Sequence, residues 1–282
     1  MERLPQNRGL RAVYLMTQRY LRHNVGIQGA ALAFYLLFMI FPLLIFLSAL
    51  LGLLQLDVAG IELALQELLP REVVDLIVAY LSYVGENPSP RLLVFGLIFS
   101  IYFPMRATNS LMRSVRTAYH LGPPRGAVLH LLKALAYTVV LMVSIALTLV
   151  VLTVGDRLLF YAVTEFHLPT IIAQTWARLR FPVVAVAGFF VLYFLYALAQ
   201  DHRRPWKDLW PGTLAALGGW MVISLLYSLY VDKIAHYSAL YGSIGAVIVL
   251  LIWLYLGAVT LIMGAEFNGT IISLRRDGEG EI

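Results

Sequence analysis

The chain of 282 residues is 60% hydrophobic and only 13% charged, with a net charge of +5 and no cysteine. A soluble domain of this length needs about a quarter of its residues charged to cover its surface, so the composition indicates a membrane protein. The missing thiols exclude disulfides, thiolate metal sites and cysteine nucleophiles.

Six apolar stretches are each long enough to cross the hydrocarbon core, which takes about 20 helical residues. They predict an all-α membrane bundle forming one domain, with spans at 29–54, 91–110, 131–155, 182–200, 211–231 and 243–267. Fifteen of the 21 Lys and Arg residues lie in or beside the N-terminal arm, the second and fourth gaps, and the tail. Positive residues favour the cytoplasmic side, so both termini are expected there. Charges sorted in this way suit anionic lipid head groups better than nucleic acid, and no nucleic-acid partner is expected.

The N-terminal arm, residues 1–28, does not resemble a cleaved signal peptide. Within it, residues 9–25 mix apolar side chains with Arg at helical intervals. This pattern predicts an amphipathic helix lying at the cytoplasmic interface, and a simple positively charged anchor is the alternative. In the first span, Pro42 lacks an N–H and predicts a kink, which serves either helix packing or a hinge.

The longest gap, residues 57–90, predicts an extracytoplasmic helical segment. Its apolar residues recur at helical spacing among acidic ones, and Pro70 is expected to break it in two. Either a lid or a structural cap on the bundle fits this pattern.

The second span carries the most unusual polar pattern. If its helix continues past Pro104, steps of three and four residues place a polar stripe on one helical face. The members of the stripe are Arg106, Asn109, Arg113, Arg116 and His120. Clustered guanidinium groups bind phosphate, which lipid head groups carry. The alternative is that these side chains only reach out of the membrane from a helix end.

Later spans add three expectations. Phe166–Leu179 predicts a short outer helix, and Pro182 then suits the first turn of the fourth span. Near the end of the sixth span, Glu266 should be costly beside the helix C-terminus and lipid, so we expect it to pair with Arg106 or Arg113. A water-exposed carboxylate is the alternative, and the tail, residues 269–282, follows on the cytoplasmic side.

Two sequence motifs resemble the YihY/BrkB family of bacterial inner-membrane proteins, formerly labelled ribonuclease BN-like. One is the opening of the first span, Ala30 to Tyr35 followed by Phe41-Pro42; the other runs from Tyr241 to Asn268. The resemblance covers essentially the whole chain and implies a six-span bundle in the cytoplasmic membrane. Family members are connected with serum resistance and virulence, with export of lipid-like envelope components and, by an older label, with ribonuclease activity.

Chemistry along the chain favours a transporter or flippase-like protein for a lipid or amphipathic anion over an enzyme. No two histidines have a short metal-ligand spacing and no Gly-rich phosphate loop occurs, so neither metal nor cofactor is expected. A lipid-modifying site near Asp156, Glu165, Asp232 and His236 is a weaker alternative, as is a ribonuclease. The main alternative is a non-transporting membrane scaffold or an oligomeric protein that organises the envelope, in which the partner would be a second copy of the chain.

The transporter hypothesis assigns residues to two roles. Phospholipid or isoprenoid phosphate would bind at a set of six residues, Arg106, Asn109, Arg113, Arg116, Glu266 and Asn268. Hinge or packing positions would be Pro42, Gly212, Gly242 and Gly245. A groove holding both Arg106 and Glu266 would favour transport, whereas a solid bundle would favour the scaffold.

Overall fold

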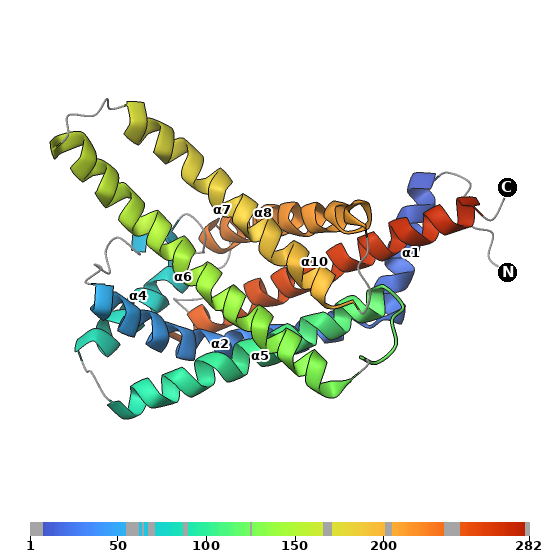
Figure 1. Cartoon of the computed structure of the whole chain (residues 1–282), viewed down its shortest axis with the longest axis horizontal. Coiled ribbons are helices and arrows are strands. Elements are labelled where there is room, and N and C mark those ends of the chain that lie inside the picture. Colours follow the sequence, from blue (N-terminus) through green and yellow to red (C-terminus); the bar gives the residue numbers. More distant parts are fainter. Residues whose placement is uncertain are drawn as a thin grey trace.

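The computed structural model describes residues 8–54, 62–63, 65–66, 71–86, 90–124, 126–165, 171–200, 205–233 and 243–279. Every regular element in these ranges is a helix (Figure 1). The helices are α1 (Arg8–Arg22), α2 (Val25–Leu54), α4 (Arg71–Glu86), α5 (Pro90–Ala118), α6 (Ala127–Glu165), α7 (Ile171–Leu198), η1 (Trp206–Asp208), α8 (Trp210–Lys233) and α10 (Ser243–Glu279). The all-α fold class is therefore confirmed.

Both described ends of the chain lie at the same end of the molecule (Figure 1). The last helix, α10, runs through the middle and packs against α2 and α8, while α5 packs against α2 on the other side. Helices α6 and α7 pack together as a long antiparallel hairpin. This arrangement brings α1, the end of α5 and the end of α10 together at the terminal end.

Two helices run through a proline. Sequence reasoning left open whether the second span ends at Pro104, and it placed the start of the fourth span at Pro182. The α5 helix runs through Pro104 to Ala118, so the polar stripe does belong to one helix. The α7 helix runs through Pro182 from Ile171, so Pro182 is not at a first turn and the part of the expected outer helix from Ile171 belongs to α7. A proline removes one hydrogen bond, and a long apolar helix can tolerate that loss when its neighbours supply packing.

Three helices among the described residues are long and apolar enough to cross a membrane: Ala127–Ile145, Trp206–Val231 and Ile244–Arg275. A fourth candidate is the pair Gly9–Arg22 and Val25–Ile40, which are bent by 62°. The other predicted spans and the orientation of the termini stay predictions.

The α4 helix gives a partial view of the segment at 57–90. Val74, Ile77 and Leu81 are buried along one face of α4, as its helical period predicts. Residues 67–70 lie outside the described residues, so the break at Pro70 is not tested. Gly242 also lies outside them, whereas Gly245 is buried in α10.

Glycines allow α8 and α10 to cross at backbone contact. A Cβ built on Gly212 would lie 2.1 Å from the carbonyl oxygen of Gly264, and one on Gly264 would lie 2.5 Å from the Cβ of Ala216. Small residues at such crossings are the usual means of close helix association in membranes. Gly212, predicted as a hinge or packing position, thus lies at a packing contact between α8 and α10.

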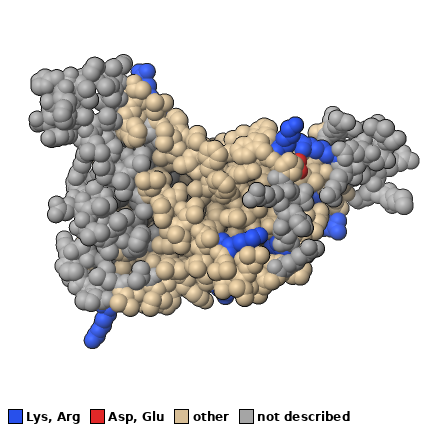
Figure 2. All heavy atoms as spheres, in the orientation of Figure 1, with Lys and Arg blue, Asp and Glu red and all other residues tan. Residues whose placement is uncertain are grey.

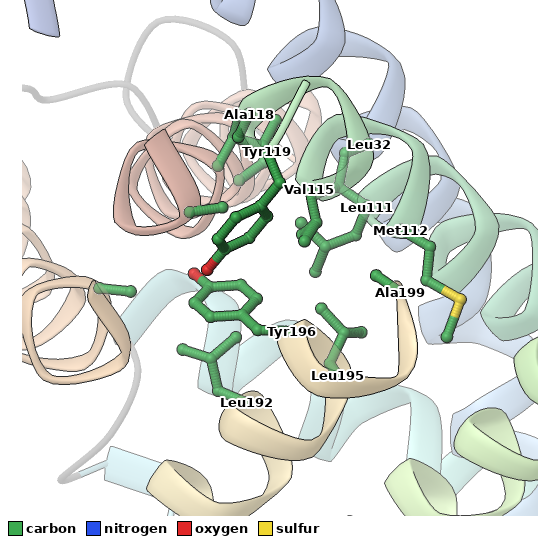
Figure 3. Close-up of a cluster of buried hydrophobic side chains, with 14 of the residues drawn as sticks. Leu32, Leu111, Met112, Val115, Ala118, Tyr119, Leu192, Leu195, Tyr196 and Ala199 are labelled. Atoms are coloured by element: carbon green, nitrogen blue, oxygen red, sulfur yellow. The ribbon is translucent and has the colours of Figure 1, made fainter. Parts of the chain in front are cut away.

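A buried apolar cluster joins α5 and α7 beside α2 (Figure 3). Leu111, Met112 and Val115 come from α5, and Leu195 and Tyr196 come from α7. The hydroxyl of Tyr196 donates a hydrogen bond to the carbonyl oxygen of Leu261 on α10 at 2.5 Å. The cluster packs around the C-terminal half of α5, the part of the helix that carries the polar stripe.

Candidate functional site

The α5 helix carries an open polar stripe at its surface. Arg106 and Arg113 are exposed, and Asn109 lies between them half-buried; we call these three residues the α5 stripe. Within the described part of the chain, neither guanidinium forms an ion pair. The stripe therefore offers two positive charges without a protein counter-ion in that part.

Two tyrosine rings flank Arg106. Its guanidinium carbon lies 5.6 Å from the ring centroid of Tyr35 on α2 and 5.9 Å from that of Tyr102, one turn earlier on α5. Such cation–π contacts are worth roughly 0.5–1 kcal/mol when exposed. They position the charge and leave N–H donors for a planar or tetrahedral anion.

Asn109 adds an acceptor to the α5 stripe. The oxygen of its side-chain amide is buried and accepts no hydrogen bond from any described residue. Leaving a buried polar atom unpaired costs about 1–3 kcal/mol, so a ligand hydroxyl or a water molecule would be stabilised there. The α5 stripe thus presents the N–H donors of two guanidinium groups at the surface, and the amide oxygen of Asn109 lies buried between them.

Lys and Arg are sparse on the face shown in Figure 2, and most of those drawn lie over the half toward the chain termini. Most of the rest of the coloured surface is without charged atoms. An arginine on such a surface is exposed to lipid or to the interface unless an anion covers it.

Arg116 was predicted to belong to the binding set, but the structure uses it to close the fold. It is 4% exposed; its Nε and Nη2 donate to the carbonyl oxygen of Gly122, and its Nη1 donates to that of Ala199 at 2.9 Å. Arg116 lies ten residues after Arg106, which places it about 80° around the helix axis from Arg106. The steps of three and four residues therefore carry the last arginine from the open face toward the interior. Lys133 reinforces the same contact by donating to the carbonyl oxygen of Gln200, and both cations lie at the C-terminus of α7.

Glu266 forms the expected inter-helix ion pair, but with a different arginine. Its Oε2 lies 3.2 Å from Nη1 of Arg19 on α1, and its Oε1 lies 2.6 Å from Nδ1 of His23. Glu266 is 0% exposed and Arg19 is 8% exposed. The prediction of Arg106 or Arg113 as partner is wrong because both point outward from α5, whereas α1 folds back over the end of α10.

Arg19 is held by more than the carboxylate. Its guanidinium donates to the carbonyl oxygens of Ala118 at 2.9 Å and Gly269 at 3.3 Å, and to the hydroxyl of Ser273 at 2.8 Å. A Cβ on Gly269 would lie 2.8 Å from Arg19 Nη1, so glycine makes room for the guanidinium. We call Arg19, His23, His120 and Glu266 the α1 cluster.

Two helix corners bring the histidines of the α1 cluster together. Asn24 and His120 have positive φ angles of 50° and 54°, the left-handed conformation that ends helices. At the end of α5, the N–H of His120 donates to Thr117 and that of Leu121 donates to Arg116, which completes a Schellman motif. As a result the rings of His23 and His120 lie 5.6 Å apart, edge to face.

His120 is neutral in this arrangement. Its Nε2 lies 3.2 Å from Nη2 of Arg19, and a guanidinium can only donate, so Nε2 must accept. Partial burial, followed by the charges of Arg19 and His23, lowers the pKa of His120. The α1 cluster is thus a network centred on the buried Arg19–Glu266 pair, with His23 and His120 hydrogen-bonded to its two members.

Asn268, also predicted to bind substrate, instead caps α8. Its Oδ1 accepts from the backbone N–H of Gly212 at 2.6 Å, and its Nδ2 donates to the carbonyl oxygen of Leu209 at 2.8 Å. The N–H groups of a first helical turn have no partner within their own helix, so this side chain supplies one from α10. Of the six predicted binding residues, the structure brings together only Arg106, Asn109 and Arg113 at an open surface.

Sequence reasoning missed four side chains that position these groups: Arg19, His23, Tyr35 and Tyr102. Arg19 and His23 are four residues apart and so share a helical face, which was a usable signal. Their partner lies 247 positions away, and no local pattern specifies such a pairing. The lipid-modifying alternative rests on the residues at 156, 165, 232 and 236. The structure does not describe their side chains.

Comparison with known proteins identifies the family. The family model described as virulence factor BrkB matches residues 16–282. This chain belongs to the BrkB family. It is 29% identical over 253 residues to a ribonuclease-like protein, YfkH, of Bacillus subtilis, covering 90% of this chain and 92% of that one.

Other relatives of this BrkB-family chain carry the name UPF0761 membrane protein. The one from Alkalilimnicola ehrlichii is 35% identical over 94 residues, which is 31% of this chain and 20% of that protein. One from Pseudoalteromonas translucida is 27% identical over 88 residues, 31% of this chain and 28% of that one. No solved structure matches the chain significantly. Together, the family and the apolar helices establish a membrane protein.

Proposed function

We propose that this BrkB-family protein binds the phosphate head group of an anionic lipid, or of a similar amphipathic anion, on the α5 stripe and moves it across the membrane. In this proposal the protein has six spans in the bacterial inner membrane, with both termini in the cytoplasm. The observation that carries the proposal is Arg106: exposed, flanked by two tyrosines and without an ion pair among the described residues.

The spacing along α5 supports movement of a head group below the membrane surface. Seven residues separate Arg106 from Arg113, which is about 10 Å along the helix axis. If Arg113 lies at the level of the lipid phosphates, Arg106 lies about 5 Å inside the roughly 30 Å hydrocarbon core, because the head-group region takes up roughly the first 5 Å of the distance. An arginine at that depth is costly unless an anion or water accompanies it, so a lipid phosphate handed from Arg113 to Arg106 is stabilised there.

A membrane scaffold is the second candidate, and the α1 cluster favours it. Arg106 and Glu266 do not share a groove; Glu266 is sealed between α1 and α10, and Asn268 ties α8 to α10. These contacts join the helices as a rigid unit. In the transport proposal, this unit holds the bundle together, and the lipid head group binds on the surface formed by α5 and α2.

The ribonuclease-like name belongs to the Bacillus subtilis relative, and no residue of the α5 stripe is a general base. The described residues hold no group of three or more His, Asp or Glu side chains placed to bind a metal ion. We propose a non-enzymatic role that needs no cofactor and no nucleic acid.

Proteoliposomes test the proposal. The purified protein would be reconstituted with a fluorescent phosphatidic acid, and the fraction of label protected from a membrane-impermeant quencher would be followed with time. We expect wild type to exchange label between leaflets faster than protein-free vesicles, and Arg106→Ala/Arg113→Ala to lose most of this rate. Arg106→Ala alone should lose part of the rate, and Lys207→Ala, on η1 and exposed, is its matched control for loss of one positive charge. Equal rates in wild type and empty vesicles would leave the scaffold as the better function.

A further inference from the structure

An unbroken series of aromatic rings runs along the seam between α2 and α5 and ends at Arg106. Successive ring centroids lie 4.6 Å apart for Phe34 and Phe38, 5.6 Å for Phe38 and Phe103, 5.5 Å for Phe103 and Phe99, and 4.3 Å for Phe99 and Phe95. We call these five residues the aromatic track.

The aromatic track connects with the head-group site at one end. Phe34 lies 5.6 Å from Tyr35, and Phe103 lies 5.3 Å from Tyr102, the two tyrosines that flank Arg106. From Arg106 to Phe95 the helix advances 11 residues, which is about 17 Å and roughly half of the hydrocarbon thickness. A molecule with its phosphate on Arg106 would therefore lay its tail along the track.

The surface of the track is open. Phe34, Phe38 and Phe95 are exposed, and Phe99 and Phe103 are half-buried. Lipid contact alone does not demand aromatic rings, as α6 demonstrates: the large exposed apolar side chains described on that helix are all Leu or Val. The α2–α5 seam thus differs from α6 in being aromatic. It differs from the exposed phenylalanines of α7, Phe190 and Phe194, in lying beside Arg106, which forms no ion pair among the described residues.

We infer that the α2–α5 seam is a binding site for a polyprenyl monophosphate, with the phosphate on the α5 stripe and the isoprenoid tail on the aromatic track. This inference rests on the proposed function and specifies its substrate class. Each five-carbon unit of such a tail carries a double bond and a methyl branch. Aromatic faces gain from packing against π systems beyond simple area burial, whereas saturated acyl chains gain area burial alone.

Lipid retention in nanodiscs, measured by native mass spectrometry, tests the inference with two probes. Polyprenyl monophosphate and dipalmitoyl phosphatidic acid share a phosphomonoester, and only the first has double bonds and methyl branches in its tail. The test variant is Phe95→Leu/Phe99→Leu, which keeps apolar, helix-favouring side chains. The control is Phe190→Leu/Phe194→Leu, a pair of exposed phenylalanines on α7.

We expect wild type and the α7 control to retain the polyprenyl probe about tenfold better than the phosphatidic acid, in line with several aromatic contacts. The Phe95→Leu/Phe99→Leu variant should bring both probes to the same retention by lowering only the polyprenyl one. Equal retention of the two probes by wild type, or an undiminished preference in the track variant, would overturn the inference.

Arg106→Ala separates this inference from the proposed function. Loss of both probes together supports phosphate capture by the α5 stripe. Retention of both probes unchanged would overturn the head-group site, and with it the proposed function, whatever the track variant does.

Discussion

Two arginine sites of this protein differ in what surrounds the guanidinium. In the α1 cluster, Arg19 is buried and meets a carboxylate, two backbone carbonyl oxygens and a hydroxyl. On the α5 stripe, Arg106 is exposed and meets two aromatic rings. A buried arginine with every direction filled can hold helices together but has nothing left for a ligand. The open one contributes little to the fold and keeps its donors for an anion.

The comparison also shows that a charged residue inside or near the membrane need not bind a ligand. The sequence predicted a binding role for Glu266, yet the residue is buried and both of its carboxylate oxygens contact side chains of α1 or the residue that follows it. Arg106 was one of several arginines in a stripe, yet the structure singles it out by its position beside Tyr35 and Tyr102. We therefore expect substitutions to affect stability at the first site and ligand binding at the second.

The largest effect should follow from Glu266→Gln. The change removes the anion but leaves Arg19 buried, and an uncompensated buried charge costs about 3–5 kcal/mol. The free energy of unfolding, measured by reversible denaturation in mixed micelles, should fall by about that amount. The double variant Arg19→Met/Glu266→Met should recover most of the loss, because neither charge is then buried. A Glu266→Gln protein as stable as wild type would contradict a stabilising α1 cluster.

A smaller effect, on binding alone, should follow from Arg106→Gln. One charge-assisted contact to phosphate is worth about 1.5 kcal/mol, so affinity for phosphatidic acid in nanodiscs should fall about tenfold. Unfolding should be unchanged, since Arg106 has no ion pair to lose among the described residues. If Arg106→Gln destabilised the protein as strongly as Glu266→Gln, the distinction between the two sites would fail.

Asn268→Ala should cost about 1 kcal/mol of stability by removing the cap from the first turn of α8. Thermal unfolding followed by circular dichroism measures this loss. Lipid binding should be unaffected, since the amide of Asn268 is used by Gly212 and Leu209. Asn268→Asp keeps the acceptor for Gly212 and should lose less than the alanine variant. Weaker lipid binding by either variant at unchanged stability would restore Asn268 to the binding site.

The smallest effect should be a dependence of stability on pH through His120. Its pKa in the folded protein lies below 6.5, because of partial burial and the nearby charges of Arg19 and His23. The unfolded chain therefore binds a proton more readily, and stability should decrease as the pH falls through 6.5 toward the folded pKa. Melting temperatures at about pH 7.5 and about pH 5.5 should differ less in His120→Asn than in wild type. An equal difference in both proteins would assign the dependence to other groups.

Sequence reasoning predicted the helical class and the helical character of residues 9–25, because these depend on local periodicity and composition. It left open whether the second span continues past Pro104, and the structure shows that α5 does. It also predicted that Glu266 would need a positive partner, since that need follows from burial near lipid. It named the wrong partner because α1 turns back through Asn24, and a single left-handed residue leaves no periodic signal. It misjudged Pro182 because a proline reads equally well as a first-turn residue or as an interruption inside a long helix.

Within the α5 stripe, sequence reasoning could group residues by angle but could not say which would point outward. Arg116 and Arg106 differ by about 80° around the helix, and that difference decides between a carbonyl clamp and an open surface. Only the packing of α7 against α5 shows that Arg116 points inward and Arg106 outward.

The pairing of Arg19 with Glu266 also has a consequence for biosynthesis. The two residues are separated by 247 positions, so the ribosome completes nearly the whole chain before the carboxylate exists. At roughly 5–20 residues per second, α1 waits roughly 10–50 seconds for its partner. α1 thus docks onto the end of α10 well after its own synthesis, and a chain that stops before residue 266 lacks the ion pair between these two helices.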